Sequence, residues 1–279
     1  MKLFAPAKLN LCLRIVGKLP DGYHLVDSLM VAVSLYDEIR IARSGKQNAL
    51  SVKCDHPDVP DGEKNIVFQA ARLLLERNKI DEGIQIVIRK KIPVGSGLGG
   101  GSSDAAATLL GLNRLFRLNL SRRTLAGLAS RLGADVPFFL DGCPARVRGK
   151  GDRLTPLSGF PRMWFVILYP GFPVSTAWAY RRFDKLTKGV TNTSITAYLK
   201  KKDWMGLLNN DLEIATVARY PKLALLKKRL IDEGANGALM SGSGSSVFGI
   251  FPAAEAARSA YHRLRKEEGA RAFLARSLN

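Results

Sequence analysis

The chain has 279 residues, 46% of them hydrophobic and 24% charged, and Lys and Arg outnumber Asp and Glu by 43 to 24. These proportions are typical of a folded globular protein, and no apolar run is long enough to cross a bilayer. The three cysteines, Cys12, Cys54 and Cys143, lack the spacing of a disulfide framework or a zinc site. We therefore expect a cytoplasmic protein without a signal peptide or membrane association, in which each cysteine is a small buried hydrophobic residue.

The formal net charge of +19 predicts attraction to polyanions. The basic residues are dispersed along the chain, however, and they are not interleaved with aromatic side chains as in a surface on which nucleic-acid bases stack. A basic solvated surface, or an anionic small substrate, explains the charge more simply. We therefore expect no nucleic-acid partner and keep a basic nucleic-acid-binding protein as an alternative.

In the first half of the chain, strands alternate with helices. Residues 8–16 alternate between apolar and polar side chains, which predicts a strand with Lys8 and Asn10 on the same face. The Asp21–Gly22 pair predicts a turn. We further predict helices over 65–78, 102–116 and 121–133 and a strand over 83–92, with Ser102, Ser103 or Asp104 capping the second helix, Ser121 capping the third, and an extended Val136 before Pro137.

The second half follows a Gly- and Pro-rich polar stretch at 149–161, which predicts a boundary between domains 1–155 and 156–279. A strand over 163–170 is followed by a loop-rich segment. We then predict helices within 194–217 and over 221–233, two strands around a glycine–serine turn within 237–251, a helix over 253–268 and a strand over 270–275. Strands and helices thus interleave in both halves, which predicts layered sheets and helices.

The segment "PVGSGLGGGSSDAA" at 93–106 places five glycines between Gly95 and Gly101. It lies between a predicted strand and a predicted helix, where backbone N–H groups and the positive end of the helix dipole favour an anion, usually a phosphate. The alternative, a tight connection without a ligand, needs fewer glycines. The segment therefore predicts a phosphate-binding loop.

The loop differs from the common phosphate-binding motifs. Gly95, Gly97 and Gly100 match GxGxxG, but no acidic residue follows about 20 positions on, and Gly101 stands where a P-loop has its lysine. A kinase with such a loop must draw its cation and its base from elsewhere in the chain. Lys8 and Asp135 are candidates, and their alternatives are a solvated strand end and a turn or cap residue.

Three segments in order resemble the GHMP kinases: "PAKLNL" near the N-terminus, "PVGSGLGGGSSDAA" in the middle and "GALMSGSGSSVFGIF" near the C-terminus. The opening "PAKLNLCLRIVGKLPDGYH" and the "GADVPFFL" segment are most similar to the 4-diphosphocytidyl-2-C-methyl-D-erythritol kinase branch. The resemblance covers the whole chain and is weakest between 175 and 235. It implies an α+β, two-lobed fold, each lobe a sheet packed with helices, with the active site in the cleft between the lobes.

The resemblance also implies the reaction: ATP-dependent phosphorylation of the 2-hydroxyl of 4-diphosphocytidyl-2-C-methyl-D-erythritol, in the non-mevalonate isoprenoid pathway. Lys8 and Asp135 become the catalytic pair, Asn65 a contact of the ATP nucleoside, and Asn10 a contact of the methylerythritol group. Tyr23 and His24 read the cytosine, and an aromatic side chain, Tyr180 with Phe172 and Trp178 as rivals, closes over it. The ATP phosphates lie against Pro93, Val94, Gly95, Ser96, Gly97, Leu98, Gly99, Gly100, Gly101, Ser102 and Ser103.

Two points stay open. Phosphoryl transfer from ATP normally needs Mg²⁺, but the sequence identifies no ligand for it: Ser103 and Asp104 carry suitable oxygens, and helix capping is the alternative for Asp104. Another GHMP kinase, of the homoserine or mevalonate type, is the alternative function, although such enzymes have no use for a cytosine site at Tyr23 and His24. The oligomeric state is not predicted.

Overall fold

The structure is a computed structural model that describes residues 1–187, 194–266 and 269–278. Its residues form two compact units, which do not follow one another along the chain. Unit 1 holds Met1–Ala7, Tyr36–Val94 and Gly99–Gly142, and unit 2 holds Lys8–Leu35, Gly95–Leu98 and the described residues from Cys143 onward. The predicted boundary at 155/156 divides the chain differently and stays a prediction.

Two long strands explain why the units interleave. Strand β1 (Lys2–Lys18) contains the strand predicted over 8–16, and β2 (His24–Arg43) returns after the turn at Asp21–Gly22, where the Gly22 N–H donates to the Leu19 carbonyl at 2.9 Å. Each strand contributes residues to both units. The alternation seen in the sequence reflects a strand buried on both faces, because Asn10 and Cys12 are as inaccessible as Leu9 and Leu11.

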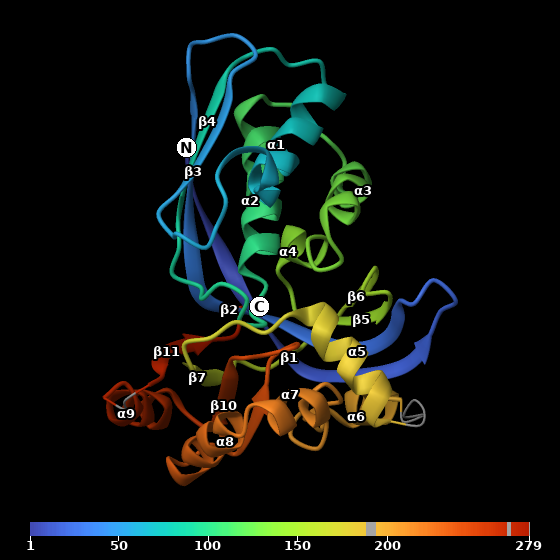
Figure 1. Cartoon of the computed structure of the whole chain (residues 1–279), viewed down its shortest axis with the longest axis vertical. Coiled ribbons are helices and arrows are strands. Elements are labelled where there is room, and N and C mark those ends of the chain that lie inside the picture. Colours follow the sequence, from blue (N-terminus) through green and yellow to red (C-terminus); the bar gives the residue numbers. More distant parts are fainter. Residues whose placement is uncertain (188–193, 267–268, 279) are drawn as a thin grey trace. The chain divides into compact units, whose positions relative to one another are not determined.

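Unit 1 is built on β4, which pairs antiparallel with the second half of β2 and parallel with β3. Helix α2 packs against α1, α3 and α4 (Figure 1). The predicted cap at Ser121 is confirmed, since its side chain accepts a hydrogen bond from the Thr124 N–H, and Asn65 caps α1 in the same way, which the sequence did not indicate. The elements are β3 (Leu50–Cys54), the 3₁₀ turn η1 (Gly62–Lys64), α1 (Ile66–Arg77), β4 (Ile84–Arg89), α2 (Gly100–Leu115), α3 (Arg122–Leu132) and α4 (Phe138–Asp141).

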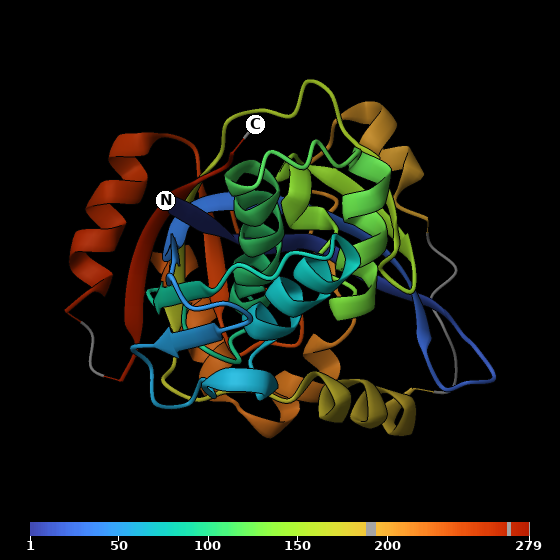
Figure 2. The same cartoon turned by 90° about the horizontal axis from the view of Figure 1, so that it is seen from above.

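Unit 2 contains an antiparallel sheet in the order β11-β7-β10-β9. Helix α8 packs against β9 and β10, and α9 packs against β7, β10 and β11, beside which it runs in Figure 2. The β5–β6 hairpin pairs with the first half of β2, and β8 pairs with β1. The elements are β5 (Ala145–Gly149), β6 (Arg153–Pro156), β7 (Trp164–Tyr169), α5 (Thr176–Leu186), α6 (Thr196–Lys201), β8 (Asn209–Asn210), α7 (Glu213–Arg219), α8 (Lys222–Asp232), β9 (Gly237–Met240), β10 (Val247–Phe251), α9 (Ala254–Leu264) and β11 (Arg271–Arg276).

Several local predictions were wrong. Val136 lies in a turn, where its N–H donates to the Gly133 carbonyl at 3.2 Å, because Pro137 takes a helical conformation just ahead of α4. The segment predicted to be loop-rich contains α5, capped by Ser175. Of the cysteines only Cys12 is buried, while Cys54 is half-buried and Cys143 is exposed. Within the described residues, no helix combines the length and the apolar character needed to span a bilayer.

Candidate active site

The first part of the glycine loop, Gly95–Leu98, is bound on all sides within unit 2. Its four successive backbone carbonyls each accept a hydrogen bond from a different segment. The donors are Val174 N–H to Gly95 at 2.9 Å, Ser246 N–H to Ser96 at 3.0 Å, Ser241 Oγ to Gly97 at 3.0 Å and Lys8 N–H to Leu98 at 2.9 Å. The loop is therefore joined directly to the lysine segment and to the glycine–serine turn at 241–246.

Gly97 is required by this packing. Its φ is +81°, and a Cβ on it would lie 2.0 Å from the Ser241 carbonyl oxygen. An L side chain is disfavoured in that conformation and has no room beside that backbone. The three sequence motifs therefore meet at one place, and a glycine makes the contact possible.

Lys8 is almost fully buried, with 4% of its surface exposed. Its ammonium donates to Asn10 Oδ1, Asn10 Nδ2 donates to Ser28 Oγ at 2.9 Å, and Ser28 Oγ donates to the Cys12 carbonyl at 2.5 Å. A Cβ on Gly242 would lie 3.3 Å from Lys8 Nζ. The ammonium is thus a fixed positive charge held between the strand and the glycine–serine turn, which excludes the solvated strand end as its explanation.

The second part of the loop opens helix α2 in unit 1. Gly99 is the N-cap, with φ +72°, and no side chain caps the helix. The cap predicted at Ser102, Ser103 or Asp104 was therefore wrong, because the left-handed glycine lets the helix begin at Gly100. The first N–H groups of α2 lack a side-chain acceptor, and they add to the positive end of the helix dipole.

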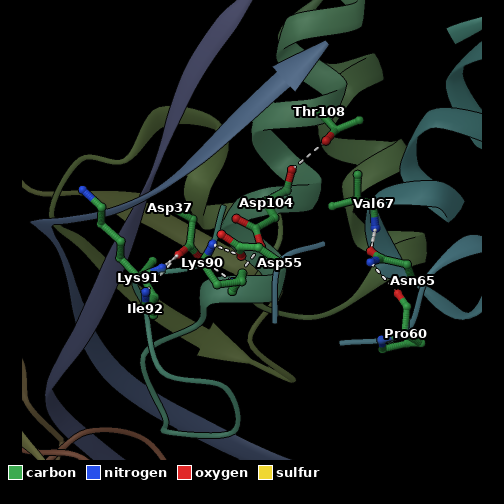
Figure 3. Close-up of polar contacts among 10 residues, drawn as sticks. All are labelled: Asp37, Asp55, Pro60, Asn65, Val67, Lys90, Lys91, Ile92, Asp104 and Thr108. Carbon is green, nitrogen blue, oxygen red and sulfur yellow. Dashed lines mark hydrogen bonds and ion pairs between the residues drawn. The ribbon is translucent and has the colours of Figure 1, made fainter. Parts of the chain in front are cut away.

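A buried cluster of two carboxylates and one ammonium lies beside this helix start (Figure 3). Lys90 Nζ contacts Asp104 Oδ2 at 2.7 Å and also donates to Asp37 Oδ2, and the three side chains are at most 4% exposed. Asp37 Oδ1 accepts the N–H groups of Lys91 at 2.6 Å and Ile92 at 2.9 Å. The cluster therefore ties β2, the end of β4 and α2 together.

The protonation of the cluster is unusual. Burial, opposed by Lys90, raises the pKa of Asp104 to about 7. Burial acts to lower the pKa of Lys90, but Asp104 and Asp37 outweigh it and raise that pKa.

Two oxygens beside this cluster, Ser103 Oγ and Asp104 Oδ1, are buried without a hydrogen-bond partner in the described part of the chain. This cluster has no signature in the sequence, because Lys90 is separated from Asp37 by 53 residues and from Asp104 by 14.

Asn65, the predicted nucleoside contact, has a clear structural role. Its Oδ1 accepts the Val67 N–H at 2.8 Å as the cap of α1, and its Nδ2 donates to the Pro60 carbonyl at 2.8 Å (Figure 3). Asp135, the predicted base, is half-buried in the turn between α3 and α4. Asp135 and Asn65 belong to unit 1, and Lys8 and Asn10 to unit 2.

The predicted base-reading residues lie in unit 2. The His24 ring stacks on Tyr180, with centroids 4.8 Å apart and planes at 25°, and His24 Nε2 lies 2.6 Å from Asp184 Oδ1. Phe172 and Trp178, the two alternatives to Tyr180, both contact the ring of Tyr220 instead. The structure thus brings His24 and Tyr180 together, and Asp184 is a partner that the sequence did not indicate.

Tyr23 presents an open aromatic surface, with 62% of the residue exposed. Lys150 Nζ lies 4.7 Å from its ring centroid and 2.6 Å from Asp21 Oδ2. A pocket of about 590 Å³ opens nearby along the start of β2 and the β5–β6 hairpin, with Arg148 and Lys150 in its wall. An exposed ring beside cationic side chains fits a ligand that carries both an aromatic base and phosphates.

The comparisons with known proteins agree with one another. The model of the GHMP kinases N terminal domain matches residues 65–143, and that of the GHMP kinases C terminal region matches residues 197–270. A 4-diphosphocytidyl-2-C-methyl-D-erythritol kinase from Syntrophotalea carbinolica is 46% identical over 276 residues, which cover 99% of this chain and 98% of that protein. The enzyme of the same name from Citrifermentans bemidjiense is 46% identical over 96% of both chains.

The chain belongs to the 4-diphosphocytidyl-2-C-methyl-D-erythritol kinase family of GHMP kinases. A solved structure of a 4-(cytidine 5'-diphospho)-2C-methyl-D-erythritol kinase is similar to this kinase with a TM-score of 0.85 and 36% identity over the whole of both chains. A homoserine kinase structure from Cytophaga hutchinsonii matches at a TM-score of 0.79 and 24% identity over 100% of this chain and 94% of the other, and it shares the fold. The predicted family and its fold, sheets packed with helices, are confirmed.

Some residues that shape the site of this kinase carry no signal in the sequence. Asn210 Nδ2 donates to the carbonyls of Met240 and Gly242 at 2.8 Å each, and so holds the glycine–serine turn in place. Ser28 Oγ accepts a hydrogen bond from Asn10 Nδ2 and so holds the Asn10 side chain in place. Both are ordinary polar residues in sequence, and only the paired strands and the turn show what they contact.

Proposed function

We propose that this kinase transfers the γ-phosphoryl group of ATP to the 2-hydroxyl of 4-diphosphocytidyl-2-C-methyl-D-erythritol, within the methylerythritol phosphate route to isoprenoid precursors. The observation that carries the proposal is the 46% identity to kinases of that name over almost the full chain. The meeting of the three motifs around the Lys8 ammonium is independent support, because phosphoryl transfer needs a fixed cation and a phosphate-binding backbone at one place.

The chain's own residues fit the nucleotide. Helix α2 begins without a side-chain cap, and a Cβ on Gly101 would meet only Ile66, at 3.7 Å. The first N–H groups of α2 and the loop from Pro93 to Ser103 bind the phosphates, and Asn65 is the proposed contact of the nucleoside. Backbone donors at a helix start stabilise negative charge without having to reorganise during the reaction.

Lys8 and Asp135 form the proposed catalytic pair. Asp135 orients the substrate hydroxyl and accepts its proton, and Lys8 stabilises the charge that develops on the transferred group. The hydrogen bond from Lys8 to Asn10 fixes the ammonium before substrate arrives. Because the two residues belong to different units, their action as a pair is part of the proposal.

Mg²⁺ is part of the proposal as well. The described residues contain no group of three or more His, Cys, Asp or Glu side chains that could hold a metal ion. Mg²⁺ bound with a nucleotide keeps several waters and takes most of its other ligands from phosphates, so one or two protein oxygens suffice. The unpartnered oxygens of Ser103 and Asp104 fit that limited role, and the ion would neutralise charge on the phosphates.

At the other end of the substrate, Tyr23 offers an aromatic face to the cytosine and His24 a hydrogen bond to its edge. Tyr180, whose ring stacks on that of His24, is the proposed second aromatic side chain that closes over the base. Asn10 is the proposed contact of the methylerythritol group. A base edge and an aromatic face together distinguish a nucleotide-linked alcohol from a free one.

The deciding experiment is a coupled ADP-release assay that offers the cytidylyl substrate, homoserine and mevalonate to the same purified protein. We expect ADP release with the cytidylyl substrate and none above background with the other two. Turnover of homoserine or mevalonate with the cytidylyl substrate ignored would contradict the assignment.

Asp135→Asn tests the catalytic pair. We expect kcat to fall by about 10³-fold or more, while the melting temperature and ATP affinity stay close to those of the unmutated protein. Asp141→Asn, on neighbouring helix α4, is the matched control, because Asp141 is exposed and pairs with Arg122. Retention of kcat by Asp135→Asn would remove Asp135 from the mechanism.

A further inference from the structure

The His24 side chain is held in place by Asp184, with which it forms a hydrogen bond. Asp184 belongs to α5 and His24 begins β2, 160 residues earlier, and the two side chains meet at 2.6 Å. Lys18 Nζ approaches the other carboxylate oxygen at 2.7 Å. The His24 side chain is 8% exposed and one of its faces lies on Tyr180. Its ring is therefore held in one orientation.

The carboxylate decides which ring nitrogen carries the proton. Burial acts to raise the pKa of Asp184, but hydrogen bonds from Lys18 and His24 outweigh it and lower that pKa. An ionised carboxylate only accepts hydrogen bonds, so His24 Nε2 must donate. In the neutral imidazole the proton is then on Nε2 and Nδ1 has a free lone pair. No group in the described part of the chain donates to Nδ1.

An acceptor at this point distinguishes pyrimidine bases. Cytosine carries an amino group at position 4, which donates, whereas uracil carries a carbonyl there, which accepts. Nδ1 as an acceptor is complementary to the amino group and repels the carbonyl. A site built for one hydrogen-bonding pattern discriminates strongly against a ligand with the opposite pattern, because polar groups are then left unpaired.

We propose that Asp184 is the specificity-determining residue of the base site: it holds His24 in the tautomer whose Nδ1 accepts a hydrogen bond, and thereby selects an amino-bearing pyrimidine over a carbonyl-bearing one. This proposal rests on the function proposed above, in which His24 faces the base of the substrate. Asp184 acts through His24, and it is a positioning residue.

The first test needs no substrate. The chain has three histidines, His24, His56 and His262, so long-range ¹H–¹⁵N correlation spectra of labelled protein report the tautomer of each ring, with the other two as references. We expect the Nε2–H tautomer in the neutral form of the His24 ring, and a shift toward Nδ1–H in Asp184→Asn, because the amide NH₂ can donate to Nε2. A His24 ring in the Nδ1–H form in the unmutated protein would overturn the proposal.

The second test compares the cytidylyl substrate with its uridylyl counterpart. We expect kcat/KM to favour the cytidylyl substrate by about 100-fold or more in the unmutated protein, and the ratio to fall to about 10-fold or less in Asp184→Asn, mostly through KM. Asp232→Asn is the matched control, since Asp232 pairs with exposed Lys228 on α8, and it should keep the full ratio. An equal loss on both substrates in Asp184→Asn would show a merely structural role and overturn the proposal.

The two tests separate this proposal from the proposed function. If the unmutated protein fails to phosphorylate the cytidylyl substrate, the function is wrong, whatever the tautomer. If it phosphorylates that substrate but discriminates poorly against the uridylyl one, or has the wrong tautomer, the function stands and the role of Asp184 is rejected.

Discussion

The two parts of the glycine loop use the same residue for different physical reasons. In Gly95–Leu98 the backbone packs against other backbone: Gly97 has a positive φ, and a Cβ there would lie 2.0 Å from the Ser241 carbonyl oxygen. At the start of α2, Gly101 is helical, and a Cβ there would make one ordinary contact, with Ile66 at 3.7 Å. The first glycine is needed for the fold, and the second leaves space that the protein itself does not fill.

This difference separates a glycine that the packing of the chain requires from one that it does not require. Sequence alone gives both the same weight, because both lie in one run of five. The space around a hypothetical Cβ distinguishes them, since a Cβ on Gly97 would overlap the Ser241 carbonyl oxygen and a Cβ on Gly101 would make only an ordinary contact. Substitutions at the two positions should therefore affect different measurements.

Gly97→Ala should have the largest effect on stability. The new methyl group would overlap the Ser241 carbonyl, and the left-handed conformation adds strain, so we expect the free energy of unfolding to fall by about 4 kcal/mol or more, or no folded protein to be recovered. Gly45→Ala is the control, because Gly45 has φ +71° and a Cβ on it would meet no atom within 4 Å. This substitution should lower the free energy of unfolding by only about 1 kcal/mol. Equal losses in urea denaturation would show that strain, and not the clash, explains Gly97.

Lys90→Met should destabilise unit 1 nearly as much. It leaves two buried carboxylates without their shared cation, and we expect a loss of about 3–5 kcal/mol in the free energy of unfolding. Lys228→Met, which removes one partner of an exposed ion pair on α8, should change it by less than about 0.5 kcal/mol. A loss below 1 kcal/mol for Lys90→Met would mean that the cluster does not hold the start of α2.

The raised pKa of Asp104 predicts a pH dependence of stability. Its ordinary value is 3.8 and its value here is about 7, so between these pH values the folded protein keeps a proton that the unfolded chain has lost. Stability from this group therefore falls as pH rises through that window, by at most about 1.4 kcal/mol per pH unit. Asp104→Asn should flatten the curve of unfolding free energy between pH 5 and 7, and an unchanged slope would contradict the assignment.

Gly101→Ala should have the smallest effect on folding and a clear one on the nucleotide. Alanine favours a helix over glycine by up to about 1 kcal/mol, so stability should hold or rise. The methyl group would occupy the space left for phosphate, and we expect the KM for ATP to rise about 10-fold. Gly127→Ala, inside α3 with nothing within 4 Å, should gain the same stability without a change in KM. An unchanged KM for Gly101→Ala would remove this glycine from the nucleotide site.

Local chemistry allowed much of the fold to be predicted from sequence. The alternation of residues 8–16 predicted β1, and Asn65 and Ser121 marked the starts of α1 and α3. The prediction failed at Gly99, because a glycine in the left-handed conformation began α2 before the expected caps. It failed again at Cys143, whose exposure depends on the surrounding fold and not on residue type.

The sequence by itself determined the family and predicted the phosphate-binding loop and the candidate residues, since these depend on residue types at fixed spacing along the chain. Only the tertiary structure decided what those residues contact. Long strands β1 and β2 thread both units, and they bring Ser241 to Gly97 and Asp184 to His24 across more than a hundred residues. Contacts at such separation have no local signature, because they form only when the sheets and helices that carry them have folded.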